Sequence, residues 1–288
     1  MRLLATADLH YNHRRGRAAA EELIDQMNRA GGDVLLVAGD TASSEGDAIE
    51  ACLSRFRFRG PRLFVPGNHE LWTHDNDSYT LFRHVLPRRI RQLGWQWLQT
   101  DPFVASGTAI IGSVGWYDYS FAQPSLGIPR RFYAAKVSPG AAAHLPEHRA
   151  LLEGPDDLPQ TARGVVARWN DGRFVKLHRG DEQFLQELLE ELETHLLAMH
   201  AARHVVAAIH HLPFAQLLPP PHNAQWDFAK AFLGSARIGD LLLRYNNVRH
   251  VLCGHSHYPI QATIEHIRAI NIGSGYRAKR FLMLDIDD

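Results

Sequence analysis

Three side chains with an amide, an imidazole and a carboxylate, Asn68, His69 and Glu70, follow the short apolar stretch 63–65. Pro66 and the glycine after it break that stretch. In α/β proteins, a strand that ends in a tight turn followed by polar residues places chemistry at the carboxyl edge of a sheet. Taken alone the motif is a modest signal, since Asn68 also suits a turn and His69 a capping role.

Four other apolar stretches end in the same way, with Asp or His side chains. Residues i and i+2 of a strand-like segment point in the same direction. Asp8 and His10 can therefore aim two ligands at one point, and so can His255 and His257. The candidate metal ligands at the five strand ends are Asp8, His10, Asp40, Asn68, His210, His255 and His257.

This set combines carboxylate oxygens, imidazole nitrogens and one amide oxygen, which suits Mn, Fe, Co or Zn better than Mg or Ca. Cys52 and Cys253 are the only cysteines and lie outside these motifs, which excludes a structural thiolate zinc site. Seven donors are too many for one ion. They fit two metals about 3.5–4 Å apart, the arrangement used for phosphoester hydrolysis. Asp40 is the natural bridging ligand, because one carboxylate can give an oxygen to each ion.

The ordered motifs Asp-x-His, Gly-Asp, Gly-Asn-His-Glu, His and Gly-His-x-His span residues 8–257. The set resembles the calcineurin-like metallophosphoesterase superfamily. The resemblance implies an α/β fold, a four-layer αββα sandwich of two mixed β-sheets flanked by helices. It implies a first divalent metal held by Asp8, His10, Asp40 and His257. It implies a second divalent metal held by Asp40, Asn68, His210 and His255. Mn, Fe or Zn is expected at both metal sites.

The resemblance also implies that His69 is the general acid near the leaving group. Glu70 would not bind a metal itself but would orient His69 or one of the metal ligands. The neighbouring His210 and His211 leave an ambiguity. We favour His210 as the ligand, because it comes first after the strand, and we expect His211 in the substrate pocket or behind the ligands.

The expected function is hydrolysis of a phosphoester by a hydroxide that two metals activate, with Asp40, Asn68 and His69 as the catalytic residues. The expected substrate is a phosphodiester or a small phosphorylated molecule. The two arginines of the protein Ser/Thr phosphatases are missing: residues 39–43 read Gly-Asp-Thr-Ala-Ser, and Pro66 precedes Gly67. That subfamily is therefore in doubt. Two alternatives stay open: a catalytically silent scaffold with this fold, and a nuclease of the same superfamily.

The elements that must position these residues follow from the hydrophobic pattern. Apolar stretches at 2–7, 33–38 and 63–65 alternate with helical patterns at 17–30 and 46–57. Such alternation predicts a parallel sheet core. Further helices are expected at 79–93, 181–202 and 235–245, and further strands at 95–98, 102–105, 108–113, 204–209, 248–253, 259–264, 267–272 and 280–286. We expect one metallophosphoesterase domain over 1–288, with an irregular excursion at about 115–180 and a proline-rich loop at 212–226.

The amino-acid composition limits the kinds of partner that we expect. The chain carries 31 basic and 31 acidic residues, so its net charge is zero. Nucleic acid is disfavoured by this balance, although a nuclease stays open, and an anionic membrane is not required. No apolar run is long enough for a membrane span, and because the sequence opens directly on a strand we expect no signal peptide. Because the chain has only two cysteines, we expect a cytoplasmic enzyme. We expect it to act on a small phosphoester and predict no protein partner.

Overall fold

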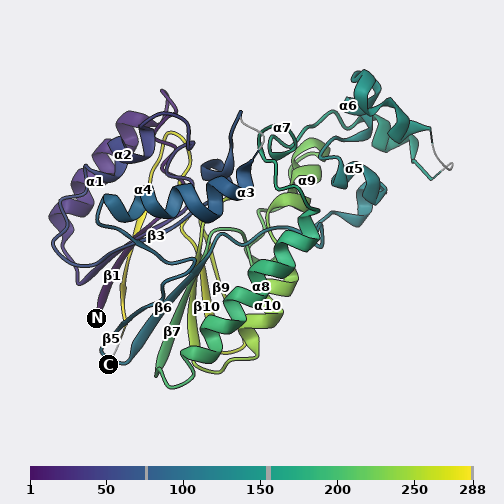
Figure 1. Cartoon of the computed structure of the whole chain (residues 1–288). Helices are drawn as coiled ribbons and strands as arrows, with labels where there is room; N and C mark the ends of the chain where they lie inside the picture. Colours follow the sequence, from purple (N-terminus) through teal and green to yellow (C-terminus); the bar gives the residue numbers. More distant parts are fainter. Residues whose placement is uncertain (75–76, 154–156, 287–288) are drawn as a thin grey trace.

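The computed structural model describes residues 1–74, 77–153 and 157–286. Within these ranges two β-sheets face each other, and helices cover their outer faces (Figure 1). The first sheet has the strand order β11 (Phe281–Asp285), β1 (Arg2–Thr6), β2 (Val34–Ala38), β3 (Arg62–Val65) and β4 (Gln96–Trp97). The second has the order β5 (Phe103–Ala105), β6 (Thr108–Ser113), β7 (His204–Ile209), β8 (Val248–Cys253), β10 (Ile267–Asn271) and β9 (Ile260–Ile264).

Both sheets are mixed. Strands β1 to β4 run parallel, and β11 joins them antiparallel to β1. In the second sheet β6, β7, β8 and β10 run parallel, with β5 and β9 antiparallel at the two edges. The predicted αββα sandwich of two mixed sheets is confirmed.

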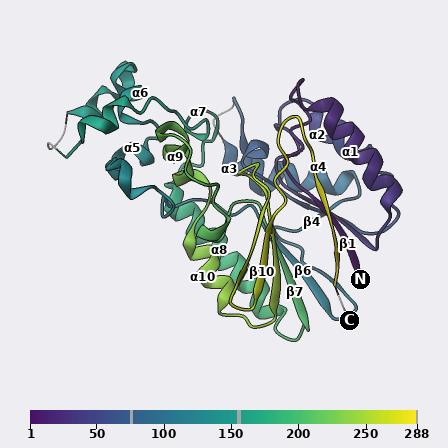
Figure 2. The ribbon, with the colours of Figure 1, turned by 180° about the vertical axis from the view of Figure 1, so that it is seen from behind.

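The helices that cover the sheets lie in two outer layers, seen from both sides in Figures 1 and 2. Helices α1 (Arg17–Ala30), α2 (Ala48–Leu53) and α4 (Leu86–Gln92) cover the first sheet. Helices α8 (Asp181–Ala198) and α10 (Ala236–Leu243) cover the second. The helical pattern at 79–93 corresponds to α3 (Ser78–Thr80), a π-helical turn (Leu81–Val85) and α4 in direct succession. None of the described helices is long and apolar enough to cross a membrane.

Alternating strand residues build two separate cores. Leu36 of β2 packs between the sheets with Val206 and Leu252 of the second sheet. Its neighbours Leu35 and Val37 face the helices instead. All are almost completely buried, and burying a side chain of this size contributes about 1.5–3 kcal/mol. The fully apolar strands thus reflect a sheet that is covered on both faces.

The described part of the excursion at 115–180 contains short helices joined by irregular chain, and none of these helices is longer than seven residues. A helical period cannot be recognised in pieces of one or two turns, which is why the sequence pattern is irregular there. The described pieces are 3₁₀ helices at Pro124–Leu126, Pro146–Leu152 and Gln160–Gly164, and α5 (Arg130–Ala134), α6 (Pro139–Ala143) and α7 (Asp171–Phe174). Residues 154–156 of the predicted excursion lie outside the described residues.

The proline-rich stretch 212–226 is not wholly a loop. It contains a 3₁₀ turn at Ala215–Leu217, and α9 (Ala224–Ala229) begins inside it. The side chain of Asn223 starts α9 by accepting a hydrogen bond from the amide of Trp226 at 2.9 Å. Helices α7 and α9 lie at the end of the sandwich to which β1 leads from the amino terminus (Figure 1).

Candidate metal centre

The carboxyl ends of β1, β2, β3, β7 and β8 bring the predicted ligands together. Two groups of side chains have ligand atoms within 4.8 Å of one another. The first group is Asp8, His10, Asp40 and His257, and the second is Asp40, His210 and His255. Asn68 follows β3 beside them, and both it and Asp40 line the same cavity.

The Asp40 side chain is shared between the two groups. Its Oδ1 lies 3.4 Å from Nε2 of His210, and its Oδ2 lies 3.7 Å from Nε2 of His10. Burial acts to raise the pKa of Asp40, but the imidazoles around it outweigh burial and hold the pKa well below its usual value. One ionised carboxylate therefore presents one oxygen to each group, which is the geometry of a bridging ligand.

In the first group, two imidazoles face each other. Nε2 of His10 lies 2.8 Å from Nε2 of His257, which in turn lies 3.8 Å from Oδ1 of Asp8. Burial lowers the pKa of both histidines, so both rings are neutral near pH 7 and keep a lone pair. Burial likewise raises the pKa of Asp8. A divalent cation would offset the cost of burying that carboxylate.

In the second group, backbone carbonyls fix the imidazole tautomers. His210 donates from Nδ1 to the carbonyl of Ala38 at 2.9 Å, and His255 donates from Nε2 to the carbonyl of Phe232 at 3.2 Å. The other ring nitrogens, Nε2 of His210 and Nδ1 of His255, face the group, as those of metal-ligating histidines usually do. Burial acts to lower the pKa of His210, but Asp40 outweighs it and raises the pKa to about 9. In the metal-free chain His210 is therefore protonated near pH 7, and it would give up the Nε2 proton to bind a cation.

Several buried polar atoms of these residues have no hydrogen-bond partner within the described ranges. They are Asp8 Oδ2, His10 Nδ1, Asn68 Oδ1, His210 Nε2 and His255 Nδ1. Leaving such an atom unsatisfied costs about 1–3 kcal/mol. All five belong to predicted ligands and are oxygens or nitrogens of the kind that Mn, Fe and Zn accept. The residues present therefore fit two divalent ions.

The backbone beneath the ligands is unusual. Five of them have left-handed φ angles: Asp8 (57°), His10 (43°), Asp40 (52°), His255 (68°) and His257 (58°). Each such residue costs on the order of 1–3 kcal/mol and persists only where the surroundings enforce it. The close approach also requires glycine at position 67, because a Cβ there would lie 2.2 Å from Oδ1 of Asp40.

Glu70 enforces part of this backbone. Its buried carboxylate accepts hydrogen bonds from the amides of Gly67 (2.6 Å), Asp40 (3.0 Å), Thr41 (2.6 Å) and Ala42 (3.3 Å). Burial raises the pKa of Glu70 to about 7, and the amide donors oppose that rise. Glu70 thus joins the turn after β3 to the turn after β2 and acts on the backbone of Asp40 rather than on the His69 ring.

His69 lies at the edge of the centre and lines a cavity of about 330 Å³. Its Nε2 is 3.8 Å from Oδ2 of Asp40, and its ring stacks on Trp72 with centroids 3.7 Å apart. Burial lowers the pKa of His69, while Asp40 and Asp171 act to raise it. The side chain is 12% exposed, so it can meet a molecule in the cavity.

His211 lies outside both groups. It donates from Nδ1 to the carbonyl of Val114 at 2.8 Å, and its ring is 4.2 Å from that of His255. Burial lowers its pKa to about 3, so the ring is neutral. The structure therefore brings His210 into the ligand cluster and leaves His211 packed behind it.

Sequence reasoning did not find the other residues around the centre. Tyr276 stacks beside His10 with centroids 5.0 Å apart, and Lys279 donates from Nζ to the backbone carbonyl of Asp8 at 2.5 Å. Burial lowers the pKa of Lys279 to about 8. Both come from the loop between β10 and β11, which carries no motif. Their only sequence signal is a polar turn between two strands.

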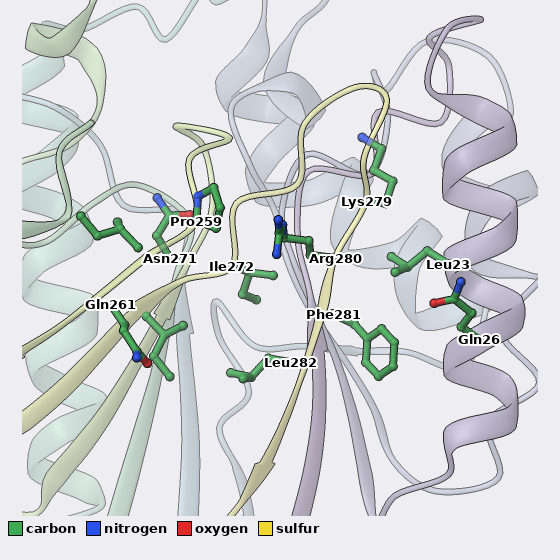
Figure 3. A pocket seen from close by; sticks show the side chains of 12 residues that line it. Leu23, Gln26, Pro259, Gln261, Asn271, Ile272, Lys279, Arg280, Phe281 and Leu282 are labelled. Atoms are coloured by element: carbon green, nitrogen blue, oxygen red, sulfur yellow. The ribbon is translucent and has the colours of Figure 1, made fainter. Parts of the chain in front are cut away.

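The cavity beside His69 has walls from distant segments. Trp72, Arg168, Trp169, Asn170, Trp226 and Tyr276 line it together with the ligand cluster. A larger hollow of about 510 Å³ lies elsewhere, between α1 and the strands β9, β10 and β11 (Figure 3). Leu23 and Gln26 of α1 line one side of it, and none of the predicted ligands lines it. The smaller cavity is therefore the candidate substrate site.

Comparison with known proteins gives consistent matches. The model of the calcineurin-like phosphoesterase family matches residues 1–259. The acyl-carrier-protein phosphodiesterase PptH of Mycobacterium tuberculosis is 40% identical over 81 residues, which are 28% of this chain and 24% of that protein. A transmembrane protein with a metallophosphoesterase domain from Danio rerio is 25% identical over 89 residues, 30% of this chain and 20% of that protein. The matched segments thus span about a quarter or less of these relatives.

Two solved structures extend the likeness to the whole fold. The crystal structure of the phosphopantetheinyl hydrolase PptH from Mycobacterium tuberculosis has a TM-score of 0.67 at 21% identity, covering 96% of this chain and 89% of that chain. The crystal structure of a dimetal phosphatase from Danio rerio has a TM-score of 0.54 at 14% identity, covering 98% and 91%. At these identities the likeness concerns the fold alone.

Proposed function

This chain belongs to the calcineurin-like phosphoesterase family, whose members are hydrolases of phosphoester bonds, and we propose that it is a two-metal phosphodiesterase. The observation that carries the proposal is the position of Asp40 between two groups of ligands, with one carboxylate oxygen toward each. In our proposal Asp8, His10, Asp40 and His257 hold one ion. Asp40, Asn68, His210 and His255 hold the other.

Two divalent ions bound there would supply a water nucleophile at neutral pH and positive charge beside the phosphoryl oxygens. The chain's own residues do the rest. Glu70 holds the backbone that carries Asp40. Burial lowers the pKa of His10, His255 and His257, so these imidazoles are neutral and would each offer a lone pair to an ion. His69 would protonate the departing oxygen from its imidazolium form, because it is partly exposed at the cavity and lies outside both ligand groups. Burial opposes that form by lowering the pKa of His69, whereas the carboxylates of Asp40 and Asp171 favour it. Trp72 supports that ring from behind by stacking.

The cavity supports a diester rather than a simple phosphate ester as substrate. Its volume of about 330 Å³ extends past the ligand cluster to Arg168, Trp169 and Trp226, so it can hold groups on both sides of a phosphorus. Arg168 is exposed, and no ion pair to it is found among the described residues. Its guanidinium is available to an anionic or polar part of the substrate.

A phosphopantetheinyl group on a carrier protein is the specific diester that we consider first. The support is the 40% identity over 81 residues to an acyl-carrier-protein phosphodiesterase and the shared fold of a phosphopantetheinyl hydrolase. Incubation of holo acyl carrier protein with the metal-loaded enzyme, followed by intact-mass measurement, tests this directly. Loss of the phosphopantetheinyl mass supports it, and unchanged carrier protein under conditions where a synthetic diester is cleaved rejects it.

Two other functions are less well supported. A silent scaffold has no need for the unpartnered ligand atoms and strained backbone of this centre. A nuclease would gain affinity from a basic strip, but the chain has no net charge. A steep loss of DNA affinity with rising salt would favour the nuclease over our proposal.

The test of the proposed function compares two synthetic substrates, bis-p-nitrophenyl phosphate and p-nitrophenyl phosphate. The protein is stripped of metal, resupplied with Mn²⁺ and measured beside Asp40→Asn. We expect Mn²⁺-dependent turnover, faster with the diester, that the substitution abolishes. Turnover of the monoester alone would show that the enzyme is a phosphomonoesterase and not a phosphodiesterase. Turnover of neither, in protein holding two ions, would favour the scaffold.

A further inference from the structure

Asp171, at the start of α7 in the excursion, lies at a meeting point of four hydrogen-bond donors. Its Oδ1 accepts from Nδ2 of Asn68 at 2.8 Å and from Nε1 of Trp72 at 2.6 Å. Its Oδ2 accepts from Nε1 of Trp169 at 2.7 Å and from the hydroxyl of Tyr117 at 3.1 Å. Asp171 is 1% exposed, so these donors replace water around its carboxylate.

The bond to Asn68 determines which end of that amide faces the metal centre. The oxygen and nitrogen ends of an asparagine have nearly the same shape, so sterics do not distinguish them. A carboxylate only accepts hydrogen bonds, and Asp171 therefore selects the NH₂ end. The oxygen end, Oδ1 of Asn68, is left buried without a hydrogen-bond partner among the described residues. It is thus the free atom that can bind a metal.

The same carboxylate also holds two walls of the candidate substrate cavity. Trp72 and Trp169 both line that cavity and both donate to Asp171. His69 stacks on Trp72 with centroids 3.7 Å apart. Asp171 thus connects the excursion, the cavity walls and the support of His69 to one predicted ligand.

We propose that Asp171 is a positioning residue of the metal centre: by holding the Asn68 amide it keeps the oxygen toward the second ion, and so couples the excursion 115–180 to metal binding. The proposal rests on the proposed two-metal function, and it concerns the site of Asp40, Asn68, His210 and His255. A packing role alone is the competing explanation. Under that explanation Asp171 merely anchors the excursion.

Asp181 provides a matched control for this competing explanation. Its carboxylate accepts from Nε1 of Trp116 at 2.8 Å, from Tyr119, and from Nζ of Lys136 at 2.5 Å. It is thus a second aspartate with Trp and Tyr donors that anchors the excursion. Within the described part of the chain, its carboxylate accepts from none of the predicted ligands. Asp181→Asn should loosen the packing of the excursion without changing the orientation of the Asn68 amide.

The experiment measures Mn²⁺ binding rather than turnover. Metal-free wild type, Asp171→Asn and Asp181→Asn are titrated with Mn²⁺, and the electron paramagnetic resonance signal distinguishes a spin-coupled pair from isolated ions. We expect wild type and Asp181→Asn to bind two ions as a coupled pair. In Asp171→Asn, the affinity for one of the two ions should fall about 10–100-fold, the usual effect of losing a partner of a ligand.

A double variant checks the direction of the hydrogen bond. Asn68→Asp with Asp171→Asn exchanges the amide and the carboxylate, so position 171 donates and position 68 accepts. The exchange restores only this contact, because Nε1 of Trp72 shares Oδ1 of Asp171 as its acceptor and loses it. We expect this exchange to recover the coupled pair that Asp171→Asn loses. The exchange variant also serves as the test if Asp171→Asn alone does not fold.

Three results would overturn the proposal. One is wild-type affinity for both ions in folded Asp171→Asn. Another is an equal loss in Asp181→Asn, which would indicate general loosening. The third is a folded exchange variant that binds a single ion. Failure of the proposed function is distinguishable, because it would be seen as two bound ions without phosphoester turnover in wild type, which leaves this binding test intact.

Discussion

The buried carboxylate of Glu70 accepts a hydrogen bond from the backbone amide of Asp40 at 3.0 Å. Through the same Oε2 it also accepts from the amide of Gly67 at 2.6 Å. The turns after two neighbouring strands are therefore held together by one side chain. Since Asp40 has a left-handed backbone, with φ of 52°, this bond helps to keep the shared ligand in a conformation that it would otherwise avoid.

Glu70→Gln should weaken both stability and the metal centre. Glu70 accepts hydrogen bonds through both carboxylate oxygens, whereas the side chain of glutamine has one oxygen and one NH₂ group. The NH₂ group would face backbone N–H donors, so at least one buried N–H is left unpaired, at a cost of about 1–3 kcal/mol. Urea unfolding of the metal-free proteins measures this loss. Glu187→Gln, in a half-buried ion pair with Arg179 away from the centre, is the control and should cost less. Equal stability of Glu70→Gln and wild type would contradict the role of Glu70.

Gly67→Ala should disrupt the centre by steric contact. Its Cβ would lie 2.2 Å from Oδ1 of Asp40 and 2.7 Å from Nε2 of His210, far inside van der Waals contact. The shared carboxylate must then move, at a cost of about 1–3 kcal/mol. Metal analysis after dialysis against Mn²⁺ should find fewer ions per chain. Gly164→Ala, whose added Cβ meets nothing within 4 Å, should retain the wild-type metal content. Full occupancy in both variants would contradict this packing argument.

His69→Ala should affect substrates according to their leaving group. A general acid contributes about 10²–10⁴-fold when the departing oxygen needs a proton. A p-nitrophenolate leaving group needs little such help, whereas an alkoxide needs much. We expect turnover of bis-p-nitrophenyl phosphate to change little, and turnover of an alkyl phosphodiester to fall by about two orders of magnitude or more. A uniform loss with both substrates would argue against His69 as the acid.

Metal removal should lower thermal stability. The buried ligand atoms without hydrogen-bond partners, such as Asn68 Oδ1 and His255 Nδ1, gain partners only when ions bind. Each ion at a hundred times its Kd stabilises the folded chain by about 2.7 kcal/mol. We expect Mn²⁺ to raise the Tm of stripped wild type by roughly 5–15 °C and that of Asp40→Asn by much less. The same increase in both proteins would place the metal elsewhere.

The ends of the strands and most of the architecture could be predicted from the sequence. Short apolar strands covered on both faces, such as β2 and β7, leave a continuous apolar run, and the polar residue after each run marks the sheet edge. The αββα fold follows from that alternation together with the family resemblance, and it is confirmed. Helix α1 begins at Arg17 and ends at Ala30, as its pattern predicts.

Other features required the structure, because they depend on contacts between distant segments. The sequence favours His210 over His211 from its place after the strand, but the hydrogen bonds of the two rings to the carbonyls of Ala38 and Val114 are seen only in the structure. The bond between Asn68 and Asp171 joins residues 103 positions apart. The excursion that carries Asp171 has helices too short to give a period. The predicted role of Glu70 was open between His69 and a ligand, and its hydrogen bonds go to the backbone of the Asp40 turn.

The most direct test is the rate of bis-p-nitrophenyl phosphate hydrolysis measured against the number of Mn²⁺ ions bound per chain. If Asp40 joins two ions in one hydrolytic centre, turnover should appear as the second ion binds, and Asp40→Asn should remain inactive at every occupancy. Full turnover in chelator-treated protein, or an Asp40→Asn variant as active as wild type, would contradict the two-metal account.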